Sequence, residues 1–208
     1  MNSKIVSVIF IVLMVTFSFG CVIPYPNFNS SNIVSASDQQ TINDRYEDEI
    51  LNSELNFVNV EVLSFDWFEF MNKHFTKYKT VRVIDIQSGR EYYVQRLGGY
   101  NHADVQTIDS ENTTIFKSIY GGEWSWKRRP VWVEIDGQFF AGSTNGMPHG
   151  FSILDNNEGG HTCIHFLNSK THGTKRVDEQ HQECVDYASK TKELLREFLR
   201  KETDSYIK

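Results

Sequence analysis

The residues best suited to chemistry gather in one stretch, Gly146–Gly173, which surrounds a single cysteine with histidines. Glycines and short polar residues separate these histidines, whereas the buried face of a helix would show an apolar stripe at helical spacing. The pattern therefore indicates a reactive or metal-binding site rather than ordinary core packing. The stretch holds one of the three cysteines and four of the seven histidines of the chain, namely Cys163, His149, His161, His165 and His172.

A cysteine thiol becomes a useful nucleophile when a neighbouring imidazole takes its proton or stabilises the thiolate. If residues 161–165 (HTCIH) form a strand, His161, Cys163 and His165 point to one face, because alternate residues of a strand share a face. His149 approaches from a separate loop. These patterns leave open which histidine is the base.

The order of these residues resembles a divergent form of the L,D-transpeptidase signature, in which an upstream histidine precedes Ser/Thr-His-Gly-Cys, a variable residue and Arg or Asn. Enzymes of that family are exported, β-rich cysteine acyltransferases that cross-link peptidoglycan. The resemblance implies that Cys163 is the nucleophile, that His149 is the base and that His161 supports the loop. The backbone N–H groups near Thr162 and Cys163 would then stabilise the oxyanion.

The chain departs from that signature at several positions. Gly160 stands in place of Ser/Thr, Thr162 in place of the glycine before the cysteine, and His165 in place of the usual arginine. The gap after His149 is also shorter. Over about Val81 to Ala188, the chain more closely resembles a group of exported Gram-positive proteins often joined to cell-wall-binding repeats. The strings that carry this likeness are GGYNHADVQ, YGGEWSWKRRP, NGMPHG and GHTCIHFLNSKTHGT.

Acyl transfer on peptidoglycan stem peptides also predicts groups that bind the substrate. Arg128 and Arg129 beside Trp126 are suited to a substrate carboxylate, because guanidinium groups bind carboxylates in a bidentate manner. An equally plausible interpretation is a hairpin edge with stacked surface arginines. His165 and Asn168, which follow the cysteine in the chain, complete the predicted substrate-binding set. The hypothesis of cysteine-dependent acyl transfer needs no cofactor.

A zinc site is the alternative for the same histidines. His102 and Asp104, with His149, His161 or His165 as a third ligand, supply the imidazole and carboxylate groups of a catalytic zinc centre. A zinc-dependent peptidoglycan peptidase is therefore the second hypothesis, although no HExxH spacing is present. A non-catalytic domain that binds the cell wall is the third. A disulfide between Cys163 and Cys184 would leave no nucleophile.

The N-terminus predicts export. A basic residue followed by an uncharged apolar run gives residues 1–20 the layout of a signal peptide, and Gly20-Cys21 resembles a lipoprotein processing site. Cleavage after Ala36 or an uncleaved anchor are alternatives. Residues 21–56 are expected to be a linker or lipid-anchored tether, and residues 57–208 the catalytic domain. The protein is thus expected outside the cytoplasmic membrane, tethered to it or secreted.

The elements that position these residues are mostly strands. Net charge is −6, which argues against nucleic acid as a partner because phosphate binding needs a basic face. We expect a β-rich α+β domain, with the L,D-transpeptidase-like sandwich or barrel implied by the resemblance, short flanking helices and a C-terminal helix. Apolar periodicity and turn residues predict hairpins over 81–96 and 131–141 and helices over 65–75, 107–120 and 178–201.

Overall fold

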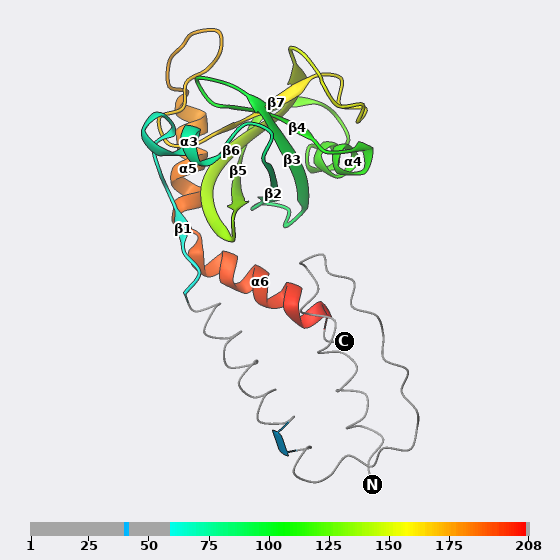
Figure 1. The fold of residues 1–208 in the computed structure, drawn as a ribbon, viewed down its shortest axis with the longest axis vertical. Helices are drawn as coiled ribbons and strands as arrows, with labels where there is room; N and C mark the ends of the chain where they lie inside the picture. The colour runs from blue at the N-terminus through cyan, green and yellow to red at the C-terminus, as the bar shows by residue number, and fades with distance from the viewer. Residues whose placement is uncertain (1–39, 42–58, 207–208) are drawn as a thin grey trace. The chain divides into compact units, whose positions relative to one another are not determined.

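The computed structural model describes residues 40–41 and 59–206 of the chain (Figure 1). The expected signal peptide at 1–20, the lipidation site Cys21 and most of the linker 21–56 lie outside the described residues. Within the described part of the chain, no helix is both long and apolar enough to cross a bilayer. Residues Val60–Leu195 make one compact unit, which holds the strands of the sheet.

The strands form one sheet that closes into a barrel, as Figure 1 shows. Their order is β1-β6-β5-β2-β3-β4-β7, and β7 also pairs with β6. The six strands β2 to β7 therefore form a closed antiparallel barrel, and β1 pairs in parallel with β6. The strands are β1 (Val62–Leu63), β2 (Thr80–Asp85), β3 (Glu91–Gly98), β4 (Ala103–Thr107), β5 (Ser125–Ile135), β6 (Gln138–His149) and β7 (His161–His165). The predicted β-rich α+β class is confirmed.

Both predicted hairpins are present. In β2, Val81 and Val83 are buried in the barrel core, as expected of alternating residues on a sheet with one apolar face. Asp136 and Gly137 join β5 to β6 with φ angles of 52° and 76°. Positive φ at both central residues is the requirement of the two-residue turn that matches the twist of a hairpin, and an Asp-Gly pair meets it with little strain.

Asp side chains start three of the helices, because a carboxylate at the N-cap accepts hydrogen bonds from otherwise unpaired backbone N–H groups. Asp66 accepts from the N–H groups of Phe68 and Glu69, Asp109 from Asn112, and Asp178 from His181. The helices are the π-helical turn η1 (Trp67–Met71) with α3 (Asn72–His74), α4 (Ser110–Ile119), α5 (Glu179–Ser189) and α6 (Lys192–Tyr206). Of these, α5 packs against β5 and β6 (Figure 1).

The single helix predicted over 178–201 is wrong, because the chain forms α5 and α6 with a break at Lys190 and Thr191. The hydroxyl of Thr191 donates to the Ala188 carbonyl at 2.7 Å and accepts from Trp132 Nε1 at 2.9 Å. A threonine side chain that bonds to nearby backbone competes with the helical pattern. The apolar periodicity continues across the break and so gave no sign of it.

The loop between β3 and β4 is held tightly, and it leads directly into His102. Arg96 donates to the carbonyl oxygens of Gly98 at 2.8 Å and Gly99 at 2.9 Å, and Trp67 Nε1 donates to the Tyr100 carbonyl at 2.7 Å. Gly99 has a φ of 91°, and a Cβ there would lie 2.0 Å from the carbonyl oxygen of His102. Glycine is therefore required at this position.

A buried ion pair ties β2 to β5. Arg129 donates to both carboxylate oxygens of Asp85, at 2.7 and 2.6 Å, and the Asp85 side chain is fully buried. Ser88 also donates to this carboxylate through its N–H at 2.8 Å. Removal of one member of such a pair leaves an uncompensated charge in the interior.

We therefore expect Arg129→Met to lower the free energy of unfolding by about 3–5 kcal/mol in urea denaturation at neutral pH. The control is Lys79→Met, which removes a more exposed pair with Asp136 and should cost less than about 1 kcal/mol. Equal losses in the two variants would contradict a structural role for the buried pair.

Candidate active site

Cys163 lies at the middle of β7, and its side chain is held by strands on both sides. Its partners in the sheet are Asp104 of β4 and Asn145 of β6. Directly opposed residues of antiparallel strands project their side chains to the same face. Asn145 Nδ2 accordingly donates to Cys163 Sγ at 3.2 Å.

Cys163 and Cys184 are both free thiols, so the disulfide considered from the sequence is not formed. Cys163 is 4% exposed. Cys184 lies on α5, where burial raises the pKa of its thiol despite a hydrogen bond with Ser143. A raised pKa makes a thiol less reactive. Cys163 is therefore the better candidate for a nucleophile.

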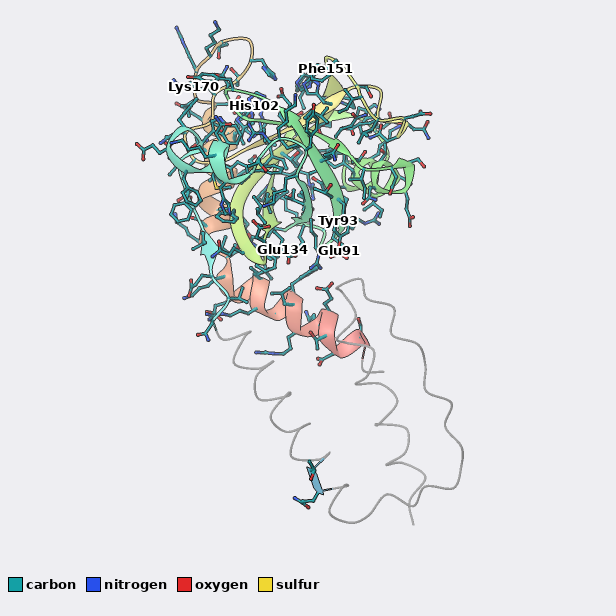
Figure 2. The ribbon with its side chains drawn as sticks, in the orientation of Figure 1. Glu91, Tyr93, His102, Glu134, Phe151 and Lys170 are labelled. Carbon is teal, nitrogen blue, oxygen red and sulfur yellow. The ribbon has the colours of Figure 1, made fainter. Side chains whose placement is uncertain are left out.

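His102 is the histidine whose contacts involve the Cys163 thiol and an acidic group together. One of its ring nitrogens lies within 4.8 Å of Cys163 Sγ, and its Nε2 lies 3.3 Å from Asp104 Oδ1. Its Nδ1 lies 2.6 Å from the Lys170 carbonyl oxygen, and because a carbonyl only accepts, Nδ1 carries a proton. Figure 2 shows His102, Phe151 and Lys170 at one end of the barrel and Glu91, Tyr93 and Glu134 at the other.

The electrostatics of His102 favour its protonated form. Burial alone would lower its pKa, but the Asp104 carboxylate and the Cys163 thiol beside the ring outweigh that effect and raise the pKa to about 10. At neutral pH the ring is therefore an imidazolium. A cationic ring next to a thiol stabilises the thiolate, which is the reactive form of cysteine.

Asp104 is the buried carboxylate on which three histidines converge. Its Oδ1 lies 3.0 Å from His172 Nε2, 3.3 Å from His102 Nε2 and 3.9 Å from His161 Nε2. Burial would raise the pKa of this carboxyl group, but the adjacent rings of His102, His172 and His161 lower it. Asp104 is therefore ionised at neutral pH and can orient the His102 ring.

His149 and His161 lie together at the ends of β6 and β7, where they are cross-strand partners. Their ring centroids are 4.7 Å apart. A Cβ at Gly150 would lie 2.4 Å from His161 Cε1, so glycine at that position leaves room for the ring. These two rings group with His172, whereas the rings grouped with Cys163 are His102 and His165. Position in the motif favours His149 as base, but the contacts of the thiol favour His102.

His165 faces the interior and stacks on other histidines. Its ring is parallel to that of His181, with centroids 3.7 Å apart, and lies 4.4 Å from the ring of His102. Both His165 and His181 are 1% exposed. Burial is the main cause of the low pKa of both rings, and it lowers that of His181 to about 3. His165 therefore stays neutral at pH 7.

The other predicted substrate-binding residues differ in how strongly they already interact with side chains of the protein itself. Trp126 is 51% exposed, and its ring lies 5.4 Å from that of His149, whereas the Arg129 side chain is buried against Asp85. Arg128 donates to Asp178 Oδ2 at 2.8 Å. The guanidinium groups thus already have carboxylate partners within the protein.

Asn168 and Thr162 mainly hold the structure around the cysteine. Asn168 Nδ2 donates to Asp66 Oδ2 at 2.7 Å and so ties the loop after β7 to the cap of η1. The Thr162 side chain is buried in β7. A backbone N–H in a strand points toward one neighbouring strand, and Cys163 has a paired strand on each side. The N–H of Cys163 thus points into the sheet.

Metal-ligating side chains form three groups among the described residues. The predicted zinc ligands His102 and Asp104 do lie together, but the structure groups them with His172 rather than His149. In each group, one ligand atom of every residue lies within 4.8 Å of those of the other two residues. The groups are His102 with Cys163 and His165, His102 with Asp104 and His172, and His149 with His161 and His172.

Two contributors to the site carry little signal in the sequence. Asn145 stands in a polar stretch of β6, and only the β6–β7 register places its amide on the thiol. The Lys170 carbonyl is a backbone group, so no side chain marks it. The segment Asn101-His102-Ala103-Asp104 singled out two side chains that the structure places together, although they were considered as zinc ligands.

Comparison with protein-family models, with curated proteins and with solved structures found no match to this chain. The likeness to the L,D-transpeptidase signature therefore rests on the residues around Cys163.

The stacked histidines predict how stability depends on pH. An unfolded histidine has a pKa of about 6.5. His165 and His181 have lower values when folded, so the unfolded state binds more protons and stability falls as the pH drops below about 6.5. We expect a loss approaching about 1.4 kcal/mol per pH unit for each ring, measured by urea denaturation between pH 7.5 and 5.

The neighbouring charges do not reverse this trend. Asp178 raises the pKa of His181, whereas Arg128 and His102 lower it. The raised pKa of His102 gives a contribution that is fully present below about pH 6.5 and is lost only as the pH rises toward 10. His181→Gln should therefore reduce the slope, and an unchanged slope in that variant would contradict the assignment.

Proposed function

We propose that this protein is a cysteine-dependent acyltransferase or peptidase in which Cys163 is the nucleophile, His102 its proton-transfer partner and Asp104 the group that orients His102. The observation that carries the proposal is the position of His102, with a ring nitrogen within 4.8 Å of Cys163 Sγ and Nε2 3.3 Å from Asp104 Oδ1. A nucleophile, a base and a group that orients the base are the parts that covalent catalysis needs.

The proposed reaction follows from these positions. The Cys163 thiolate attacks the carbonyl carbon of a peptide bond, and a tetrahedral oxyanion forms. As the C–N bond breaks, the His102 imidazolium gives its proton to the leaving amine, and a thioester remains on Cys163. An acceptor amine or water then loses a proton to His102 and attacks the thioester, which releases the thiolate and restores the imidazolium.

Asn145 is the candidate donor for the oxyanion. Its Nδ2 already lies 3.2 Å from Cys163 Sγ, so it is close to any carbonyl that bonds to that sulfur. Asn145 is 2% exposed, and a donor held in a buried site stabilises developing charge without reorganisation. The side-chain amide thus takes the role that the sequence predicted for backbone N–H groups near Thr162 and Cys163.

The proposed substrates are peptidoglycan stem peptides, cleaved or joined at the bond before a terminal D-alanine. This choice rests on the resemblance around Cys163 and on the predicted export signal. Trp126 and Phe151, which are 51% and 56% exposed, adjoin the rings of His149 and His161 and offer an apolar rim for a substrate. The proposed location is the outer face of the cytoplasmic membrane or the medium.

We expect Cys163→Ser to lower the rate by at least about 10³-fold, because the weaker nucleophile cannot form the thioester readily. The measurement is the profile of tetrapeptide muropeptides after purified peptidoglycan is incubated with the full chain. Cys184→Ser is the matched control and should keep full activity. Unchanged processing by Cys163→Ser would rule out the catalytic cysteine.

The same assay separates the other hypotheses. A zinc peptidase that uses His102 and Asp104 would be inhibited by a chelator, restored by zinc and insensitive to thiol alkylation. A wall-binding domain would sediment with peptidoglycan and leave the stem peptides unaltered. Either result would overturn the proposed cysteine mechanism.

Asn145→Ala should lower kcat by about 10²-fold with a smaller change in KM, because the amide would act mainly in the transition state. His102→Gln should lower kcat by about 10²–10⁴-fold through loss of proton transfer. A variant at Asn145 that folds normally by circular dichroism and keeps the wild-type kcat would exclude its role at the oxyanion.

A further inference from the structure

Three histidines near the proposed site form a group of their own that does not include Cys163. His149 ends β6, His161 begins β7 and His172 lies in the loop before α5. One ring nitrogen of each lies within 4.8 Å of the others. His149 and His161 are also cross-strand partners, so barrel closure holds these two rings side by side.

The outer contacts of these rings leave one nitrogen of each able to act as a ligand. Nδ1 of His149 lies 2.9 Å from the Met147 carbonyl oxygen, and Nδ1 of His161 lies 2.9 Å from that of Phe151. Because a carbonyl oxygen only accepts, these Nδ1 atoms carry protons and the Nε2 atoms of the neutral rings have free lone pairs. A carbonyl oxygen that accepts from one ring nitrogen commonly orients a histidine whose other nitrogen binds a metal.

His172 follows the same pattern with a carboxylate in place of a carbonyl. Its Nε2 lies 3.0 Å from Asp104 Oδ1, which accepts the proton of that nitrogen. The Nδ1 of the neutral ring is then the free ligand atom. A carboxylate that accepts from the distal nitrogen of a histidine also makes the other nitrogen a better metal ligand.

His161 supplies an independent sign that a ligand is missing. Its Nε2 is buried and has no hydrogen-bond partner among the described residues. The nearby Asp104 Oδ1 is 3.9 Å away, which is too far for a hydrogen bond. A buried polar atom without a partner is rare in folded proteins, and a bound cation would satisfy this lone pair.

We propose that His149, His161 and His172 bind a divalent transition-metal ion of the class to which zinc belongs. Three neutral imidazoles suit Zn²⁺, Cu²⁺ or Ni²⁺, and they leave further coordination positions for water or an anion. Zinc–nitrogen bonds of about 2.0–2.1 Å place tetrahedral ligand atoms about 3.4 Å apart. His149 is half-buried and the His172 side chain is 46% exposed, so both rings have room to rotate inward.

The test is a calorimetric titration of the metal-stripped full chain with Zn²⁺, in the Cys163→Ser background so that no thiolate of the proposed active site competes. We expect one equivalent to bind, and His149→Gln or His172→Gln to weaken binding by at least about tenfold. His74→Gln is the matched control, since His74 lies outside the cluster, and it should bind as the parent does. The binding readout does not require the proposed acyl transfer to be correct.

Several outcomes would overturn this site. One is the failure of the parent chain to bind Zn²⁺. Another is a loss of binding in His172→Gln but not in His149→Gln, which would place the ion with His102 and Asp104. With Co²⁺ in the unmutated chain, a thiolate-to-cobalt charge-transfer band that disappears in Cys163→Ser would assign the ion to Cys163 instead.

Discussion

The double pairing of β7 is the constraint on which the candidate site depends. Cys163 has Asp104 of β4 on one side and Asn145 of β6 on the other, and opposed residues of antiparallel strands share a face. Closure of the barrel thus brings a thiol, a carboxylate and an amide together from three strands. His102, which immediately precedes β4, comes with them, and the Lys170 carbonyl accepts its Nδ1 proton. A site built on strands of a closed sheet is held more precisely than one built on loops.

Crowding of histidines in a buried region forces a division between charged and neutral rings. In a low-dielectric interior, a charged ring persists where a counter-charge or hydrogen bond stabilises it. His102 has Asp104 and the thiol beside it and is protonated at neutral pH, whereas His165 and His181 are stacked on each other and stay neutral. The position of Asp104 therefore decides which ring is protonated at neutral pH. It also explains how chemically identical side chains acquire different roles.

Several elements follow from neighbours in the chain, and the sequence predicts them. Alternating valines in β2 and the Asp136-Gly137 turn predict the hairpins, and Asp109 or Ser110 predicts the start of α4, where the structure has Asp109 as the cap. Residues 161–165 do form a strand, with Cys163 at its centre. These features depend on local backbone conformation and on which face of a strand is apolar, and such information is contained in residues a few positions apart.

What the sequence determined by itself was the set of hairpins and caps and the central place of Cys163 among reactive side chains. Only the tertiary structure decided that His102 lies beside the thiol, that Asn145 donates to it and that Arg129 is paired with Asp85. Each of these contacts joins residues from different strands or from a loop and a strand. The register of the closed barrel sets them, and no local pattern records which residues a distant strand will place opposite.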